Sequence, residues 1–189
     1  MPGPFGAPGP GAQQPFEIKV LDQAALEDAV PALAALLLDC VRGGASVSFL
    51  SDLTLERAEG FWREVAAAAS RDGRRVLAAQ DAEGLAGTVQ VIPFPMANKP
   101  HRAEVAKMLV HSRARRRGIG AALLAAAEVQ ALALGRPLLS LDTETGSAGE
   151  QFYRRLGWRE IGVIPDEAYN GRGELAPTTL FYKRLDSGG

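Results

Sequence analysis

A loop rich in arginine and glycine stands between a candidate strand and a candidate helix. Its residues are Arg115-Arg116-Arg117-Gly118-Ile119-Gly120, and the helix is expected to run from Gly118 to Leu134. Free backbone N–H groups and the dipole at a helix N-terminus favour an anion. Gly118 and Gly120 allow the backbone to approach a ligand closely, and the arginines add positive charge. The segment therefore predicts a pyrophosphate site.

Two other phosphate motifs do not account for this loop. The dinucleotide pattern GxGxxG requires a third glycine where Leu123 stands, and no Gly-Lys-Ser/Thr of a Walker loop occurs. The strand–loop–helix instead resembles the coenzyme-A loop of the GNAT N-acetyltransferases. In that pattern Gln or Arg is followed by two residues, Gly, one residue, and Gly or Ala. Arg115, Gly118 and Gly120 match it.

A second segment, Glu150 to Trp158, resembles the other GNAT signature. It is a short helix with a Phe-Tyr pair that ends in Leu-Gly and an aromatic residue, and it lies one strand downstream of the loop. The sequence departs from the family at Gly146 and Ser147, where many members have an asparagine. Further passages are similar to the tabtoxin-resistance acetyltransferases of the same superfamily: Gly43–Phe49, His101–Lys107, Leu141–Ser147 and Pro177–Lys183.

The resemblance implies an enzyme that uses acetyl-CoA as cosubstrate and moves the acetyl group to a primary amine. The acceptor is expected to be small and amino-acid-like, with detoxification of a toxin as one role, and transfer is direct, without an acyl-enzyme. The residues expected to contact the coenzyme are Met108, Leu109, Val110, Arg115, Arg116, Arg117, Gly118, Ile119, Gly120 and Ala121.

Acetyl transfer to an amine needs a base, because an alkylammonium with a pKa of about 10 is not a nucleophile at neutral pH. Glu104, near the start of the strand that leads to the loop, is the first candidate, acting through water. A salt bridge with Arg102 or Lys107 is the alternative. Asp142 stands at the end of an apolar strand, where a buried carboxylate indicates catalysis or amine binding, or else a strand-end cap.

Tyr153 is the candidate acid that protonates the leaving thiolate, a role that the family resemblance implies. Phe152 and Leu156 are four residues apart and are expected to face the core, which turns Tyr153 to another side. The amine pocket is expected beneath two loops, 45–53 and 165–177. Candidate polar contacts in these loops are Ser46, Ser48, Tyr169 and Asn170.

Three alternative functions remain open. The chain could be a coenzyme-A-binding regulatory domain without turnover, or an acetyltransferase for a peptide or protein amine. The arginine cluster from Arg113 to Arg117 could also bind nucleic acid, but no aromatic residues interleave it and the net charge is −1. We expect neither nucleic acid nor a membrane as a partner, and a monomer or homodimer.

Composition is typical of a globular protein. The 189 residues are 47% hydrophobic and 23% charged, which fits one α/β domain or at most two small ones. Cys40 is the single cysteine, so no intramolecular disulfide forms, and a reducing cytoplasm is the expected setting. Cys40 follows three leucines and is expected in the core. His101 and His111 lack partners at metal spacing, so no metal is expected.

The expected fold class is α/β, the GNAT fold, with a mixed central sheet of about seven strands flanked by about four helices. Residues 1–14, rich in Pro and Gly, are expected to form a disordered tail, and residues 15–186 a single N-acetyltransferase domain. The expected strands are Phe16–Val20, Arg75–Gln80, Leu85–Ile92, Arg102–Val110, Leu138–Thr143, Trp158–Ile164 and Thr178–Arg184. The expected helices are Asp22–Arg42 with a break near Pro31, Thr54–Ser70, Gly118–Leu134 and Ser147–Gly157.

Overall fold

The computed structural model describes residues 15–185, so the predicted tail 1–14 and the predicted last domain residue, 186, lie outside the described residues. Seven strands form one mixed sheet in the order β1-β2-β3-β4-β5-β7-β6. The strands are β1 (Glu17–Leu21), β2 (Arg75–Asp81), β3 (Gly84–Pro93), β4 (Arg102–Val110), β5 (Leu138–Glu144), β6 (Arg159–Tyr169) and β7 (Leu175–Arg184). β4 and β5 are parallel, and the other neighbours are antiparallel.

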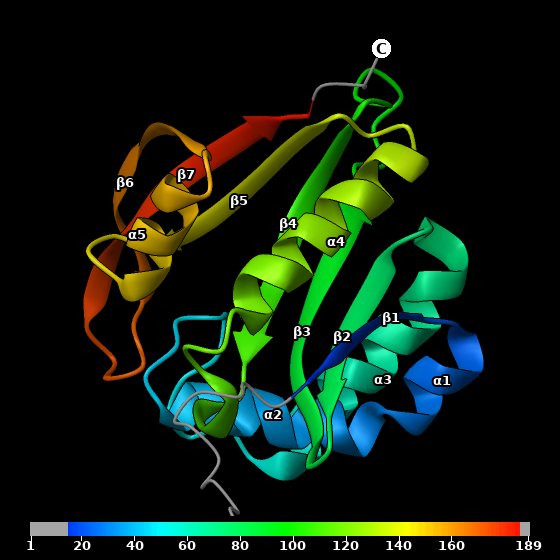
Figure 1. The fold of residues 1–189 in the computed structure, drawn as a ribbon. Coiled ribbons are helices and arrows are strands. Elements are labelled where there is room, and N and C mark those ends of the chain that lie inside the picture. The colour runs from blue at the N-terminus through cyan, green and yellow to red at the C-terminus, as the bar shows by residue number, and fades with distance from the viewer. Residues whose placement is uncertain (1–14, 186–189) are drawn as a thin grey trace, which may run out of the picture.

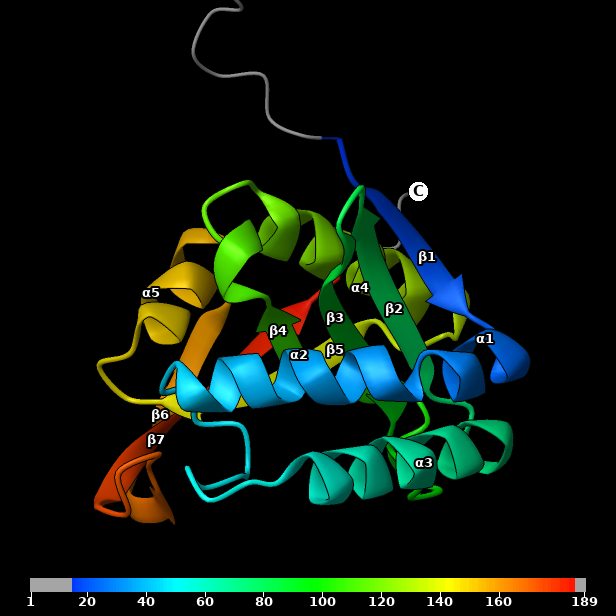
Figure 2. The ribbon, with the colours of Figure 1, turned by 90° about the horizontal axis from the view of Figure 1, so that it is seen from below.

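Helices cover both faces of this sheet. They are α1 (Gln23–Asp28), α2 (Val30–Arg42), α3 (Leu55–Asp72), α4 (Ile119–Ala133) and α5 (Ala148–Arg155), with a 3₁₀ turn, η1 (Ser112–Ala114). Figure 2 shows α2 and α3 on one side of the sheet and α4 on the other. Each side has its own buried cluster, because each helix layer buries one apolar face against the strands. None of the helices within residues 15–185 has the length and apolar character needed to cross a membrane.

The predicted mixed α/β fold is confirmed, with five α-helices in place of about four. The difference lies at Pro31, where the first expected helix is divided. Pro31 occupies the first turn of α2, the position at which its missing N–H is not needed. Ala29 ends α1 and precedes α2, so the chain changes direction there without a loop.

The predicted loop 165–177 is wrong, because β6 and β7 continue through most of it as a hairpin. An irregular register between Ile164 and Ala168 accommodates Pro165 and leaves Asp166 with a positive φ of 52°. The turn is narrow because the Oδ1 atom of Asn170 accepts hydrogen bonds from the backbone N–H groups of Arg172 and Glu174. The polar residues that indicated a loop therefore serve a bulge and a turn.

β4 and β5 diverge within the sheet, and this divergence creates the space for a site. They pair only from Arg102 to Glu104 on β4, and Figure 1 shows them separating beyond that point. A bulge places Lys107 and Met108 opposite the single residue Val89, and Lys107 has a positive φ of 49°. The edge of β4 that faces the gap is thus available to a ligand between the two strands.

Candidate functional site

A cavity of about 760 Å³ lies where β4, the loop after η1 and the start of α5 meet. It is lined by all the predicted coenzyme residues except Arg117. The other lining residues, which sequence reasoning did not assign to coenzyme binding, are Cys40, Ala45, Ala114, Ala148, Gly149, Phe152, Tyr153 and Arg155. Most of these come from α2 or α5, which are distant in sequence from the loop.

The N-terminus of α4 opens into this cavity. Gly118 precedes the helix with a φ of 80°, and no side chain caps the first turn. Arg116 also has a positive φ, 62°, so the loop folds tightly before the helix begins. Uncapped backbone N–H groups beside the Arg115 and Arg116 side chains form a concave surface suited to an anion such as pyrophosphate.

Gly120 is required by a close approach between α4 and α5. A Cβ atom there would lie 3.3 Å from the Phe152 ring and 3.7 Å from a methyl carbon of Val110. A larger residue would therefore push α5 away from α4 and narrow the cavity between them. This explains the second glycine of the loop by packing as well as by access to a ligand.

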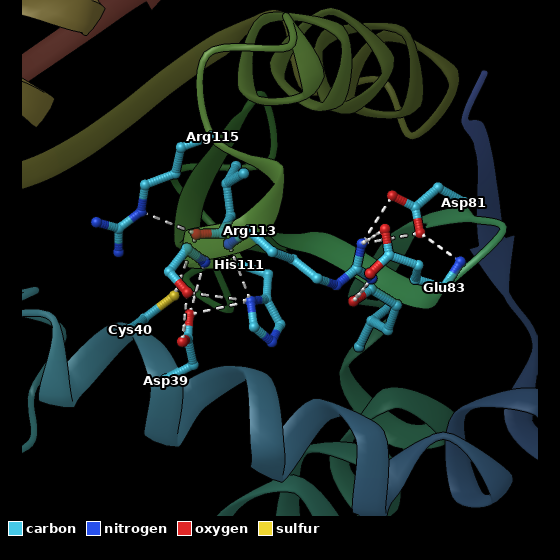
Figure 3. A network of polar contacts seen from close by, with 10 residues as sticks. Asp39, Cys40, Asp81, Glu83, His111, Arg113 and Arg115 are labelled. Atoms are coloured by element: carbon cyan, nitrogen blue, oxygen red, sulfur yellow. Dashed lines mark hydrogen bonds and ion pairs between the residues drawn. The ribbon is translucent and has the colours of Figure 1, made fainter. Parts of the chain in front are cut away.

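Asp39 on α2 anchors the beginning of the loop (Figure 3). Its carboxylate accepts hydrogen bonds from the backbone N–H and the hydroxyl of Ser112, both at 2.7 Å, and lies 3.3 Å from Nδ1 of His111. Burial would raise the pKa of Asp39, but the Ser112 hydrogen bonds and the nearby His111 and Arg115 lower it overall. The carboxylate is therefore charged at neutral pH and holds η1 against α2.

Asp81 at the β2–β3 turn anchors the other side of the loop. Its side chain has no exposed surface, and both of its oxygens accept from Nη1 of Arg113, at 3.0 and 2.9 Å (Figure 3). Nη1 of Arg117 lies 2.7 Å from the same carboxylate. The hydrogen bonds from Arg113 and Arg117 hold the pKa of Asp81 well below its usual range.

These ion pairs change the interpretation of the arginine cluster. Arg113 and Arg117 turn toward Asp81, and neither lines the cavity, whereas Arg115 and Arg116 do. Two of the four charges that could have faced nucleic acid or a phosphate are thus engaged with a buried carboxylate. Sequence reasoning assigned Arg117 to the coenzyme because the partner, Asp81, lies 36 residues away.

Cys40 and Arg115 both contact the last residue of β4. The Cys40 thiol lies 3.5 Å from the carbonyl oxygen of Val110, and Nε of Arg115 lies 3.4 Å from the same oxygen (Figure 3). Burial raises the pKa of Cys40 to about 11. The thiol is therefore protonated at neutral pH, which agrees with the predicted core role and not with a nucleophile.

Helix α5 is fixed by a buried carboxylate. Ser147 caps its first turn by accepting from the N–H of Glu150. Glu150 does not complete a capping box with Ser147, since it accepts from the N–H of Gly146 at 2.6 Å and from the hydroxyl of Thr179 at 3.0 Å. Because Thr179 is on β7, these bonds hold the helix to the sheet and fix the position of Tyr153 one turn later.

Tyr153 is more deeply buried than the sequence predicted. It is only 8% exposed and packs with Trp158 and Phe181, whereas Phe152 and Leu156 are partly buried at the edge of the core. The prediction that Phe152 and Leu156 turn Tyr153 away from the core is wrong. Its hydroxyl has no hydrogen-bond partner among residues 15–185, and burial together with the charge of Asp142 raises its pKa. Tyr153 is therefore a neutral donor at physiological pH.

A second cavity, of about 300 Å³, lies on the other side of Tyr153. All three predicted catalytic residues line it. Its lining consists of Ser46, Val47, Ser48, Glu104, Val105, Ala106, Lys107, Asp142, Glu144, Tyr153, Glu167, Ala168, Tyr169 and Thr178. Tyr153 lines both cavities, so it stands at the boundary between them.

The carboxylates of Glu104 and Asp142, which line this cavity with Tyr153, differ in environment. Burial raises the pKa of Glu104, the Asp142 charge raises it further, and Lys107 partly offsets this. Within the described residues, Glu104 forms no ion pair with either Arg102 or Lys107. The sequence indicated a buried Asp142, but Asp142 is exposed toward the cavity because β5 has no neighbour on its β4 side at that point.

The second cavity is closed by the two segments that the sequence placed over the amine pocket. Ser46, Ser48 and Tyr169 line it as expected, whereas Asn170 holds the β6–β7 turn. A Cβ atom added at Gly171 in that turn would lie 3.8 Å from the Cα atom of Gly44, so the hairpin lies beside the loop after α2. Residues 15–185 contain no group of three His, Cys, Asp or Glu side chains that could hold a metal ion.

Comparison with known proteins was consistent with this geometry. Residues 72–160 match the family model described as an acetyltransferase (GNAT) domain. A ribosomal-protein-alanine N-acetyltransferase from Brucella melitensis superposes with a TM-score of 0.73 at 26% identity, covering 89% of this chain and 99% of its own. A phosphinothricin acetyltransferase from Sinorhizobium meliloti in complex with AcCoA superposes with a TM-score of 0.76 at 17% identity, and the match covers 92% of this chain and 90% of that one. An N-acetyltransferase from Staphylococcus aureus superposes with a TM-score of 0.75 at 16% identity, and the match covers 91% of this chain and 99% of that one.

Proposed function

We propose that this chain, which has the fold and the domain of a GNAT N-acetyltransferase, transfers acetyl from acetyl-CoA to a primary amine of a small amino-acid-like molecule. The observation that carries the proposal is Tyr153, a largely buried side chain with an unpartnered hydroxyl, which lines both a phosphate-suited cavity and an acidic cavity. Similarity to the tabtoxin-resistance enzymes supports an amino-acid-like acceptor and toxin detoxification as one role. The free Cys40 supports a cytoplasmic setting.

The larger cavity is the proposed coenzyme site. The α4 N-terminus with Arg115 and Arg116 holds the pyrophosphate, and the free edge of β4 from Met108 to Val110 offers backbone groups to the pantetheine arm. Arg117 acts in this proposal through Asp81, by keeping the loop in shape. Acetyl-CoA supplies an acetyl group activated as a thioester.

The smaller cavity is the proposed acceptor site, and three residues divide the proton transfers there. Glu104 accepts a proton from the acceptor ammonium through a water molecule, which frees the amine lone pair to attack the thioester carbonyl. Asp142 holds the amine, since its charge favours a cation beside Glu104. Tyr153 donates its proton to the sulfur as the C–S bond breaks. As the amide forms, the nitrogen loses its second proton, which restores the Tyr153 hydroxyl, and Glu104 releases its proton to water. The products are the acetylated amine, the coenzyme thiol and one proton, with no acyl-enzyme.

Acetyl-CoA at 100 times its Kd should raise the Tm by at least about 5 °C, because binding to the folded state alone adds about 2.7 kcal/mol. S-acetylpantetheine, which lacks the pyrophosphate, should raise it far less. Arg116→Ala should lower the acetyl-CoA shift, whereas Arg159→Ala, outside the cavity, serves as the matched control. Differential scanning fluorimetry measures the Tm shift with each of the two ligands and in each of the two variants. Absence of a shift at saturating acetyl-CoA would contradict the coenzyme assignment.

Glu104→Gln should lower kcat/KM about 100-fold. In the wild type, kcat/KM should decrease at low pH, with an apparent pKa above that of an ordinary glutamate, because burial raises the pKa of Glu104. In Glu104→Gln this decrease at low pH should be absent. The Tm at pH 7 should not fall. A carboxylate with a raised folded pKa contributes stability only at low pH, and the contribution disappears as pH rises through that pKa. A drop in Tm with turnover intact would instead indicate a structural ion pair.

A protein amine is the second candidate acceptor, because the Brucella relative is named for a ribosomal protein. The acceptor classes are separated by measuring thiol release from acetyl-CoA with amino acids, β-lactam analogues and a peptide with N-terminal alanine. A coenzyme-A-binding regulator without turnover would release no thiol with any of them. The small-amine proposal predicts the highest kcat/KM among the amino-acid-like compounds.

A further inference from the structure

The acceptor cavity is strongly and asymmetrically charged. Glu104, Asp142, Glu144 and Glu167 line it, and Lys107 is the only cation among its lining residues. From this charge distribution we propose that the acceptor is a small molecule with two amino groups: one is acetylated, and the other is bound as an ammonium. This inference rests on the proposed function and specifies its substrate class.

The four carboxylates are available to a ligand. None of them has a hydrogen bond or an ion pair with another described residue, whereas most other carboxylates near the loops and turns, such as Asp39, Asp81 and Glu174, are paired. Unpaired carboxylates gathered around one cavity repel each other, and this repulsion is relieved when cations enter. Tyr153, a side chain that is 8% exposed and whose hydroxyl has no partner among the described residues, lines the same space and marks its proposed reactive end.

The carboxylates form two pairs along the cavity. Glu104 and Asp142 lie at the inner end, where the charge of Asp142 acts on both Glu104 and Tyr153. Glu144 is two residues beyond Asp142 on the same face of β5, and Glu167 stands in the β6 bulge. Thr178 pairs with both Glu144 and Ile164, so β7 brings the outer carboxylates to one end of the cavity. We therefore expect one amine of the acceptor to lie beside each pair.

Lys107 offsets this charge only in part: it interacts electrostatically with Glu104 and Asp142 but forms no ion pair with either. Its ammonium donates to the Ser48 hydroxyl at 3.3 Å and lies 5.6 Å from the centre of the Phe61 ring, which directs it toward the loop after α2. A single ammonium on the acceptor would leave the outer carboxylates without a counter-charge. A carboxylate on the acceptor could reach Lys107, so both a diamine and a diamino acid share the proposed chemistry.

The test compares matched acceptors in the thiol-release assay on the full chain. 1,5-Diaminopentane is paired with pentylamine, and L-lysine with L-norleucine, so each pair differs by one amino group. We expect kcat/KM to favour the dication about tenfold in each pair, and the ratio to shrink as ionic strength rises. Comparison of kcat/KM for L-lysine and 1,5-diaminopentane shows whether the acceptor is a diamino acid or a simple diamine.

Variants locate the effect. Glu144→Gln with Glu167→Gln should lower the dication-to-monoamine ratio about tenfold, mainly through KM. Asp166→Asn is the matched control, because it removes the same charge from the β6 bulge outside the cavity and should leave the ratio unchanged. Equal kcat/KM within both pairs, or a ratio that Asp166→Asn lowers as much, overturns the inference while the proposed function stands. No thiol release with any amine overturns both.

Discussion

Replacing Tyr153 with phenylalanine should lower kcat about 100-fold, whereas the Kd for acetyl-CoA should change less than about twofold. The reason is that the substitution removes one proton donor, and general acid catalysis contributes about 100- to 10,000-fold. The ring keeps its contacts with Trp158 and Phe181, and no described residue loses a hydrogen bond. Steady-state kinetics and calorimetric titration with acetyl-CoA measure the two quantities.

Tyr182→Phe is the matched control for this result. Tyr182 is on β7 and lines neither cavity, so the same loss of a hydroxyl should leave kcat unchanged. The Tyr153 variant should also keep its wild-type Tm. If turnover survives in Tyr153→Phe, another group protonates the thiolate. If Tm and Kd both collapse, the hydroxyl has a structural role that the described contacts do not contain.

Asp81→Ala should lower the free energy of unfolding by about 3 kcal/mol, because two partly buried arginines would lose their buried partner. The Asp81 side chain is fully buried, and two arginines, Arg113 and Arg117, depend on it. Urea denaturation measures the change. The loop that begins α4 should also become mobile, so the KM for acetyl-CoA should rise in the variant.

Glu83→Ala provides the control, because Glu83 faces the same Arg113 at 3.8 Å but its side chain is 58% exposed. An exposed pair of this kind contributes about 0.5 kcal/mol. The Asp81 contribution also has a defined pH dependence. Its folded pKa is lowered, so the stabilisation is present above the unfolded pKa of about 3.9 and is lost as pH falls through the folded value. A pH-independent difference between wild type and variant would contradict the ion-pair explanation.

The residues predicted to contact the coenzyme could be grouped from the sequence because they are nearly continuous along the chain. Met108 to Val110 and Arg115 to Ala121 form one strand end, one loop and one helix start, and all of these except Arg117 line the large cavity. Caps at Asp22, Thr54 and Ser147 likewise set helix starts through bonds that span only three residues. Such local signals act within a few residues, so the sequence carries them openly.

The smaller cavity, the proposed acceptor site, could be predicted only in part, because six separate segments meet there. The strand positions of Glu104 and Asp142 were readable, but the outer carboxylates, Glu144 and Glu167, were not identified. Glu167 was assigned to a loop, since Pro165 and its polar neighbours are typical of one. The register that places Glu167 at the same cavity as Glu144 depends on the pairing of β6 with β7, which no local pattern encodes.

The sequence by itself determined the fold class, the order of the elements and the loop that suits a pyrophosphate. The tertiary structure alone decided which charges are free. It paired Arg113 and Arg117 with Asp81, buried Tyr153 and left the acceptor carboxylates unpaired. The physical reason is the distance along the chain over which each interaction acts. Capping, turns and periodicity act over a few residues, whereas burial and ion pairing depend on which distant segments the packed sheet brings together.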